Sequence, residues 1–171
     1  NNGGFENGTT GWSPSGTAKL TSEKASEGNQ SIKMTCDGSN QGYIESNQID
    51  VEAEKTYKVS YKLYIEDQGD GNDAQCYALV YAFDASGNVI SGGVIDESGR
   101  WASTGAWETI SFDYKTPTGA KSIRIDFMHN AVAGTSYWDD VQITLEEAVY
   151  ADVKKEYLNN GGFENGTTGW S

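Results

Sequence analysis

Trp101 is an aromatic side chain that the apolar pattern of the sequence does not account for. It lies beside Arg100 in the polar segment 97–106, where no alternation of apolar residues would bury it. A flat aromatic face can stack on a ligand ring, and a neighbouring guanidinium can hydrogen-bond the ligand's polar groups. Arg100 and Trp101 are therefore candidates for a binding surface.

The segment 75–84 carries a second set of aromatic candidates. Its alternation places small apolar residues on one face and Gln75, Tyr77 and Tyr81 on the other. If the small residues form the core side, these three side chains make a row along one outer face. In segment 121–130, Arg124 and Asp126 face away from the apolar positions, so they either contribute to binding or belong to a solvated surface.

Few residues here suit nucleophilic catalysis. His129 is the only histidine, and neither serine nor cysteine lies in an elbow motif such as G-x-S-x-G. The 25 acidic residues contain no pair that stands out as two carboxylates opposed across a cleft. We therefore expect a protein that binds and is not an enzyme.

Short alternating segments must position these side chains. The sequence has 21 Gly, 10 Tyr and 5 Trp but only 2 Pro, which is typical of strands joined by tight turns. The period breaks near Ser46, where we expect a bulge. These features predict an all-β sandwich whose strands lie at 17–21, 31–36, 42–51, 56–66, 75–84, 89–95, 107–114, 121–130 and 137–145.

The charge of the chain limits its partners. A net charge of −13 would repel phosphate backbones and anionic lipids, so we expect no nucleic-acid partner. No run approaches the roughly 20 apolar residues of a membrane-spanning helix, so we expect no membrane insertion. Cys36 and Cys76 match no metal-ligand spacing and lie at apolar positions. Two buried thiols are favoured over a disulfide between them.

The thirteen residues Asn1–Ser13 recur letter for letter as Asn159–Ser171. We interpret this repeat as a domain at 1–146, a linker at 147–158 and the start of a second tandem module at 159–171. The second copy could fill the first-strand position of a neighbouring molecule, a form of domain swapping. The alternative is a flexible tail.

Four motifs in order carry a family resemblance. They are Asn-Gly-Gly-Phe-Glu at 2–6 followed by Gly11-Trp12, Glu-Gly-Asn-Gln-Ser-Ile at 27–32, Trp-Glu-Thr-Ile at 107–110 and Trp-Asp-Asp-Val-Gln-Ile at 138–143. Their order and spacing resemble the carbohydrate-binding modules of families 4, 9, 16 and 22, and family 16 most. The resemblance implies a jelly-roll β-sandwich of two antiparallel sheets that binds sugar without catalysis.

The same resemblance implies a role outside the cell. Such a module binds β-linked polysaccharide, here β-1,4-glucan or mannan, and targets a covalently attached secreted glycoside hydrolase to it. We expect a secreted or cell-surface protein. The alternative function is a calcium-stiffened structural repeat of a bacterial cell-surface protein, which would not need a row of exposed aromatic residues.

The resemblance also implies a structural Ca²⁺ ion held by Glu6, the carbonyls of Ser26 and Gly28, and Asp139. Ca²⁺ prefers six to eight oxygen ligands, which these residues could supply. By strand parity Asp139 points inward, where an unpaired carboxylate would be costly. The alternative is that both carboxylates are hydrogen-bonded to backbone donors.

The apolar pattern and the family resemblance together give the sugar-binding residues that we expect. They are Gln75, Tyr77, Tyr81, Arg100, Trp101, Trp12 and Trp138. In the family, a Trp after the opening Gly often lies near the rim of the cleft, but a buried framework role suits Trp12 and Trp107 equally well. Strand parity points Trp138 outward.

Overall fold

The computed structural model describes residues 2–67, 75–96, 105–130 and 133–146, with the side chains of 94–96 excepted. These residues form strands joined by turns, and none forms a helix that could cross a membrane. The strands are β1 (Trp12–Gly16), β2 (Lys19–Thr21), β3 (Ser31–Cys36), β4 (Gln41–Ser46), β5 (Ile49–Asp50), β6 (Thr56–Asp67), β7 (Cys76–Phe83), β8 (Val89–Asp96), β9 (Trp107–Lys115), β10 (Ser122–Asn130) and β11 (Gly134–Leu145).

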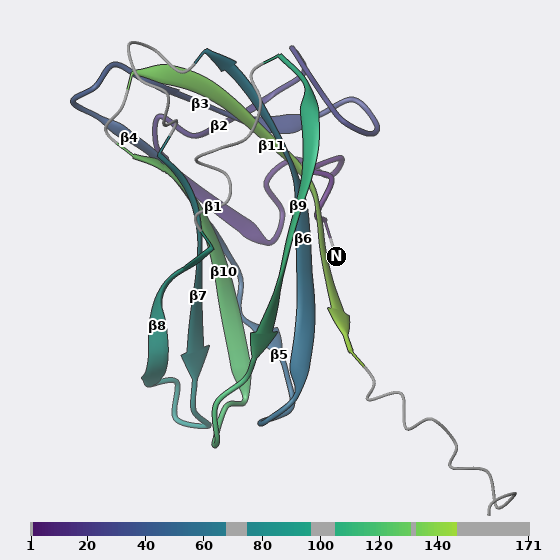
Figure 1. The fold of residues 1–171 in the computed structure, drawn as a ribbon, viewed down its shortest axis with the longest axis vertical. Helices are drawn as coiled ribbons and strands as arrows, with labels where there is room; N and C mark the ends of the chain where they lie inside the picture. The colour runs from purple at the N-terminus through teal and green to yellow at the C-terminus, as the bar shows by residue number, and fades with distance from the viewer. Residues whose placement is uncertain (1, 68–74, 97–104, 131–132, 147–171) are drawn as a thin grey trace, which may run out of the picture.

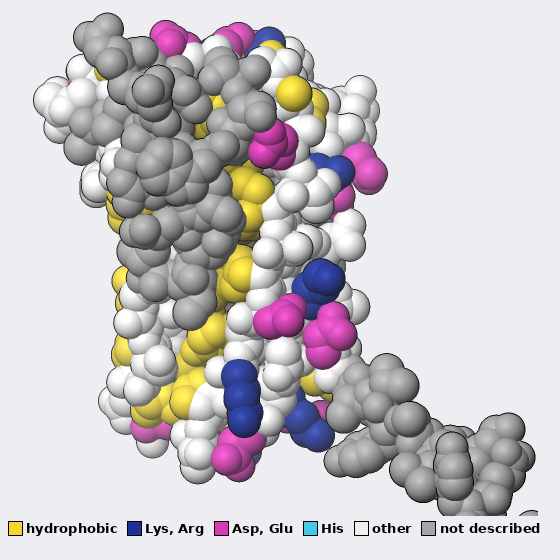
Figure 2. Space-filling view, in the orientation of Figure 1, with side chains coloured by type: hydrophobic (Ala, Val, Ile, Leu, Met, Phe, Trp, Pro, Cys, Tyr) yellow, Lys and Arg dark blue, Asp and Glu magenta, His cyan; other side chains and the backbone are white. Residues whose placement is uncertain are grey.

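Two antiparallel sheets pack face to face (Figure 1). Sheet A has the order β1-β4-β10-β7-β8, and β5 pairs with β10 beyond the end of β4. Sheet B has the order β2-β3-β11-β6-β9. In Figure 2, apolar side chains show along the line where the sheets part, and charged side chains gather over β6 and β9. The predicted β-sandwich is confirmed.

Apolar alternation located most strands because each sheet has one face on the core. In β6, every second residue from Tyr57 to Ile65 is buried. The predicted strand 42–51 is two strands, because the chain leaves the ladder between Ser46 and Ile49. The prediction missed β1, whose residues after Trp12 are exposed and show no apolar alternation.

Aromatic rings fill the centre of the sandwich. The ring centroid of Phe127 lies 4.7 Å from that of Tyr61 and 5.0 Å from that of Trp138. The Trp12 ring stacks on that of Phe127, with 6.1 Å between the ring centroids. Cys36 and Cys76 are both buried and form no disulfide with each other, which confirms the prediction for this pair.

A bulge in β11 overturns the parity that the sequence indicates. Asp140 has a positive φ of 46°, and the pairing of β11 with β6 shifts register between Asp139 and Gln142. Trp138 pairs with Leu63 on the core side and is 0% exposed, so the predicted exposure of Trp138 is wrong. Asp139 pairs with Lys62 on the outer side, so its predicted inward direction is also wrong. The carboxylate is nevertheless fully buried.

Candidate functional site

The outer face of sheet A brings aromatic and charged side chains together from three strands. Register pairs Arg124 of β10 with Tyr81 of β7, and Asp126 of β10 with Glu45 of β4. Tyr43 is two residues from Glu45 on the same face of β4. We call Tyr43, Glu45, Tyr77, Tyr81, Arg124 and Asp126 the tyrosine–arginine face.

Arg124 is the centre of this face. Its Nη2 donates to Asp126 Oδ2 at 2.8 Å and contacts Glu45 Oε1 at 2.9 Å, while Nε donates to the same Asp126 oxygen at 3.2 Å. Its guanidinium carbon lies 4.9 Å from the centroid of the Tyr81 ring. Burial alone would lower the pKa of Arg124, but the hydrogen bonding to Asp126 and the negative charges of Asp126 and Glu45 together raise it. Arg124 therefore remains a cation fixed against an aromatic ring.

The Asp126 carboxylate is only half satisfied. Oδ2 accepts the hydrogen bonds of Arg124 and a third from the Tyr43 hydroxyl at 2.6 Å. Oδ1 is buried and has no hydrogen-bond partner among the described residues. Burial raises the pKa of Asp126, and the bonds from Tyr43 and Arg124 offset this only in part. Burial and the same hydrogen bond raise the pKa of Tyr43 far above its ordinary value, so it stays protonated.

The Tyr81 ring depends on a glycine in the neighbouring strand. Tyr81 pairs with Gly92 of β8. A Cβ at Gly92 would lie 2.2 Å from Tyr81 Cδ1, closer than any real contact. The missing side chain leaves room for the Tyr81 ring beside β8, and Arg124 lies against the same ring. Tyr81 is half-buried, which leaves part of the ring accessible.

The structure places the three residues predicted in segment 75–84 as follows. Cys76, Ala78, Val80 and Ala82 belong to the core, so the tyrosines face outward as the alternation predicts. Tyr77 is 8% exposed and Tyr81 more so. Gln75 precedes the strand, half-buried and with a φ of 48°. Arg100 and Trp101 lie outside the described residues.

The structure does not bring the two other candidate tryptophans to the tyrosine–arginine face. Trp12 is 8% exposed and its ring lies 5.3 Å from Phe5, with Nε1 donating to the Asn2 carbonyl at 3.0 Å. This is the buried framework position. Trp138 is in the core, where its Nε1 donates to the Ser136 hydroxyl at 2.9 Å.

The four predicted calcium ligands do lie together, around the loop 26–30. Asp139 Oδ2 accepts the N–H groups of Ser26 at 2.7 Å and Glu27 at 3.2 Å, and Oδ1 accepts that of Asp140 at 2.8 Å. Burial raises the pKa of Asp139 even though these bonds oppose the shift. The carboxylate thus ties the last strand to the loop by hydrogen bonds.

Glu6 holds the same loop from the opening segment. Its Oε1 accepts the N–H groups of Asn29 at 2.9 Å and Gln30 at 2.8 Å, and these bonds lower the pKa of Glu6. Gly28 has a φ of 64°, and a Cβ there would lie 2.4 Å from Glu6 Cδ. Both carboxylates therefore bond backbone donors, as in the alternative to a metal site. The described residues contain no group of three or more acidic, His or Cys side chains that could hold a metal.

The sequence pointed to Arg124, Asp126 and the β7 tyrosines but not to Tyr43 and Glu45. These two residues alternate with buried positions of β4, which is a weak signal on its own. Their role depends on β4 lying next to β10, and sheet order is not visible in one sequence.

The model of a family described as "Carbohydrate binding domain", CBM_4_9, matches residues 1–140. No curated protein matches the chain. Among solved structures, a family 16 carbohydrate-binding module shares 19% identity over 84% of this chain and 97% of its own, with a TM-score of 0.63. The CBM22-1 xylan-binding domain of Paenibacillus barcinonensis Xyn10C shares 19% identity, covers 85% and 93%, and has a TM-score of 0.55.

The enzymatically active domain of bacteriophage CBA120 tailspike protein 4 also has a similar fold, with 16% identity and a TM-score of 0.65. The match covers 85% of this chain but only 21% of the tailspike chain, so the two share one domain. These structural similarities show the fold, and the family model matches most of the chain. This chain belongs to the CBM_4_9 family of carbohydrate-binding domains.

Proposed function

We propose that the tyrosine–arginine face binds β-linked polysaccharide, β-1,4-glucan or mannan, and targets an attached secreted glycoside hydrolase to it. The observation that carries this proposal is the cation–aromatic pair of Arg124 and Tyr81 beside the half-satisfied carboxylate of Asp126. The part of the Tyr81 ring that is accessible offers a surface for a pyranose ring. Arg124 and Glu45 can bond sugar hydroxyls at its edge.

The binding is an equilibrium without covalent chemistry. Stacking on one aromatic ring contributes roughly 0.5–1.5 kcal/mol beyond its buried area, so one ring gives weak binding and several polar contacts must add to it. A solved module of similar fold is in complex with β-1,4-galactotriose, at 19% identity and a TM-score of 0.58. The ligand of that module is a β-linked chain, which supports the class of ligand proposed here.

Calorimetric titration tests the ligand class. Cellopentaose and mannopentaose are titrated into the protein, with xylan and laminarin oligomers as competing β-glycans. We expect saturable heat with cellopentaose or mannopentaose that is lost in Arg124→Ala. Binding to xylan or laminarin oligomers alone would contradict the proposed ligand. No heat with any of them would favour a structural repeat.

We also propose that Ca²⁺ binds where Glu6 and Asp139 meet the loop 26–30. The two carboxylates and the loop carbonyls of Ser26 and Gly28 supply oxygen ligands of the kind that Ca²⁺ prefers. We expect calcium to raise the unfolding temperature over EDTA by about 5 °C or more. Glu6→Gln should lose most of that gain and Glu52→Gln, an exposed control, none. An equal unfolding temperature in calcium and EDTA would contradict a calcium site.

We further propose that the second copy of the opening segment can occupy the position of the first in another molecule. Phe5 is fully buried and Trp12 nearly so, and the identical copy carries Phe163 and Trp170. We expect light scattering to show a dimer that grows with concentration and is lost in Phe163→Asp. Dimers that survive deletion of residues 159–171 would exclude the exchange.

A further inference from the structure

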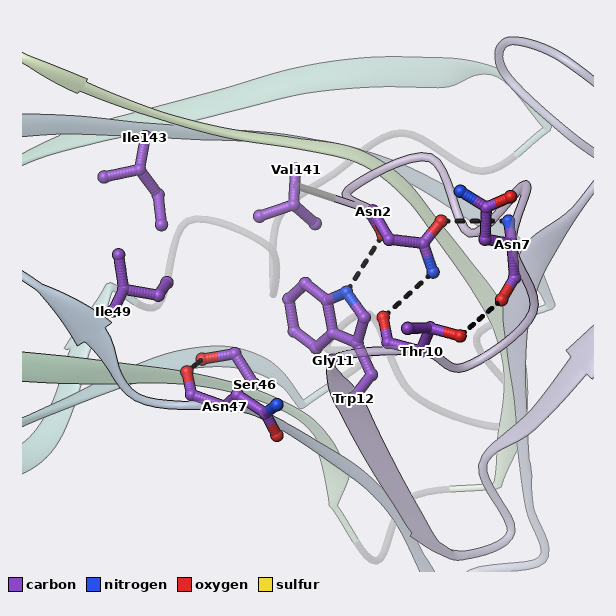
Figure 3. A pocket seen from close by; sticks show the side chains of 10 residues that line it. All are labelled: Asn2, Asn7, Thr10, Gly11, Trp12, Ser46, Asn47, Ile49, Val141 and Ile143. Atoms are coloured by element: carbon purple, nitrogen blue, oxygen red, sulfur yellow. Dashed lines mark hydrogen bonds between the residues drawn. The ribbon is translucent and has the colours of Figure 1, made fainter.

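A cavity lies at the edge of the sandwich, where the opening loop meets the two sheets (Figure 3). It encloses about 360 Å³, within the range of small-molecule sites. β1 and β5 of sheet A form one side, and the second half of β11 forms the other. We call this cavity the side pocket.

The side pocket exists because β11 changes neighbours at its bulge. Before the bulge β11 pairs with β3 as well as β6, but after it β11 pairs with β6 alone. Val141 N–H donates to the Gly3 carbonyl at 3.0 Å, so at this one residue the opening segment bonds the edge of β11 that β3 has left. Beyond that bond, Ile143 faces open space opposite Ile49 of β5 (Figure 3).

The interior of the side pocket is apolar. Ile49, Val141, Ile143 and the six-membered ring of Trp12 surround the space (Figure 3). None of the ten residues that line it is charged, in a chain with a net charge of −13. The chemistry of the lining therefore favours a neutral ligand with an apolar group to bury.

The rim is polar and held in place. Asn2 Nδ2 donates to the carbonyls of Gly8 at 2.8 Å and Thr10 at 3.1 Å, and its Oδ1 accepts the N–H of Asn7 at 3.0 Å. The backbone of Asn47 bonds the Gly11 carbonyl at 2.8 Å, which fixes the opposite wall. This network fixes the shape of the rim before any ligand arrives.

Two rim side chains have unused hydrogen-bonding groups. The amides of Asn7 and Asn47 have no hydrogen-bond partner among the described residues, and both side chains are exposed. Each offers one acceptor and two donors. The rim can therefore bond the carbonyl and hydroxyl groups of a neutral ligand whose apolar part is inside.

We infer that the side pocket binds the acetyl group of a neutral acetylated sugar. A plain pyranose carries hydroxyls on most of its carbons, and an interior of aliphatic side chains would leave them unpaired. An acetyl methyl gains from burial there, and its carbonyl reaches the amides of the rim. The inference adds a second contact to the proposed glycan binding.

The side pocket is separate from the tyrosine–arginine face. The two share no residue, and Trp12 packs on the core side of sheet A whereas Tyr81 and Arg124 lie on its outer side. A ligand can therefore fill one site without the other. This separation lets the two proposals fail independently.

Methyl NMR of isoleucine-labelled protein tests the inference directly, because Ile49 and Ile143 line the pocket and Ile125 in the core serves as an internal reference. N-acetylglucosamine and glucose are titrated separately, since they differ by the acetamido group. We expect saturable shifts of Ile49 and Ile143 with N-acetylglucosamine, at an affinity about three- to tenfold above that for glucose. The reference methyl of Ile125 should not move.

Two variants show whether the pocket itself is responsible. Ile143→Phe fills the space and should abolish the Ile49 shift, whereas Leu145→Phe, on the same strand but outside the pocket, should leave it unchanged. Asn47→Ala should weaken binding about two- to tenfold without removing a bond within the protein.

Equal shifts with both sugars, no shift of Ile49, or the same shift in Ile143→Phe would each overturn the inference. The proposed function would survive each of these results, provided that oligosaccharide binds the protein and that Arg124→Ala abolishes this binding. If N-acetylglucosamine binds the pocket while no oligosaccharide binds the protein, the proposed function fails and the inference stands.

Discussion

On the outer face of sheet B, the rings of Tyr64 and Tyr137 lie 6.0 Å apart, and Lys24 lies 5.1 Å above the first and 5.7 Å above the second. Lys24 pairs with Glu66 at 3.2 Å, and the Tyr137 hydroxyl lies 3.1 Å from the same residue. Tyr137 is only 1% exposed. The polar groups of this cluster therefore pair with one another.

The outer face of sheet A has the same kinds of side chain in a different balance. Arg124 covers Tyr81 as Lys24 covers Tyr64, and it too pairs with carboxylates. The difference is at Asp126, where one carboxylate oxygen lacks a partner among the described residues. A fully paired network stabilises a fold, whereas a buried polar atom without a partner costs stability and points to a functional role nearby. We therefore propose that the glycan binds on sheet A and that the sheet B cluster stabilises the fold.

The largest effect that we expect separates the two cations. Arg124→Ala removes charged hydrogen bonds to the ligand and should weaken oligosaccharide binding about 10- to 150-fold by calorimetry. Lys24→Ala removes the cation that lies 5.1 Å above Tyr64 and should leave the affinity unchanged. Equal losses in the two variants would break the distinction between the faces.

The affinities of the two tyrosine variants should differ in the same direction as those of the two cation variants, but by a smaller factor. Tyr81→Ala removes one stacking ring, which predicts an affinity loss of about 3- to 15-fold. Tyr64→Ala is the matched control on sheet B, and its affinity should equal that of the wild type in the same titration. A loss in Tyr64→Ala alone would move the site to sheet B.

Removing one hydroxyl tests the stabilising role of sheet B. Tyr137→Phe deletes the donor that lies between Glu23 and Glu66 and should lower the free energy of unfolding by about 1 kcal/mol. Chemical denaturation measures the change, and the oligosaccharide affinity should stay constant. An unchanged free energy of unfolding would contradict the stabilising role of this network.

The smallest effect that we expect is a pH dependence of the folding stability, caused by Asp126. Because burial raises its pKa in the fold, the folded state binds the proton more tightly than the unfolded chain. Its contribution to stability therefore falls as pH rises from the ordinary Asp value through the folded pKa. Asp126→Asn should remove that fall, by at most about 1 kcal/mol, in denaturation curves across this range.

The difference between wild type and Asp126→Asn isolates this residue from the other carboxylates. Glu6, Asp37 and Asp84 have lowered pKa values because they accept backbone hydrogen bonds, so their contributions are lost on acidification in both proteins. A wild-type curve parallel to that of the variant would contradict the buried state of Asp126.

Alternation predicted the scaffold because each sheet has one apolar face, and it placed Tyr81 and Arg124 on outer faces correctly. It failed at Trp138 because a single residue with positive φ, Asp140, changes the parity of β11. A sequence does not show such a bulge when the residue is not glycine. The approach of Tyr43 to Asp126 depends on sheet order, and the side pocket depends on the strand pairing around the bulge.

Amide NMR during titration with the oligosaccharide that binds in calorimetry tests the central claim most directly. We expect the largest shift changes at Tyr43, Tyr81 and Arg124, with the amides of Tyr64 and Tyr137 unmoved. Shifts confined to Tyr64 and Tyr137 would contradict the account and place binding on the cluster that we assign to stability.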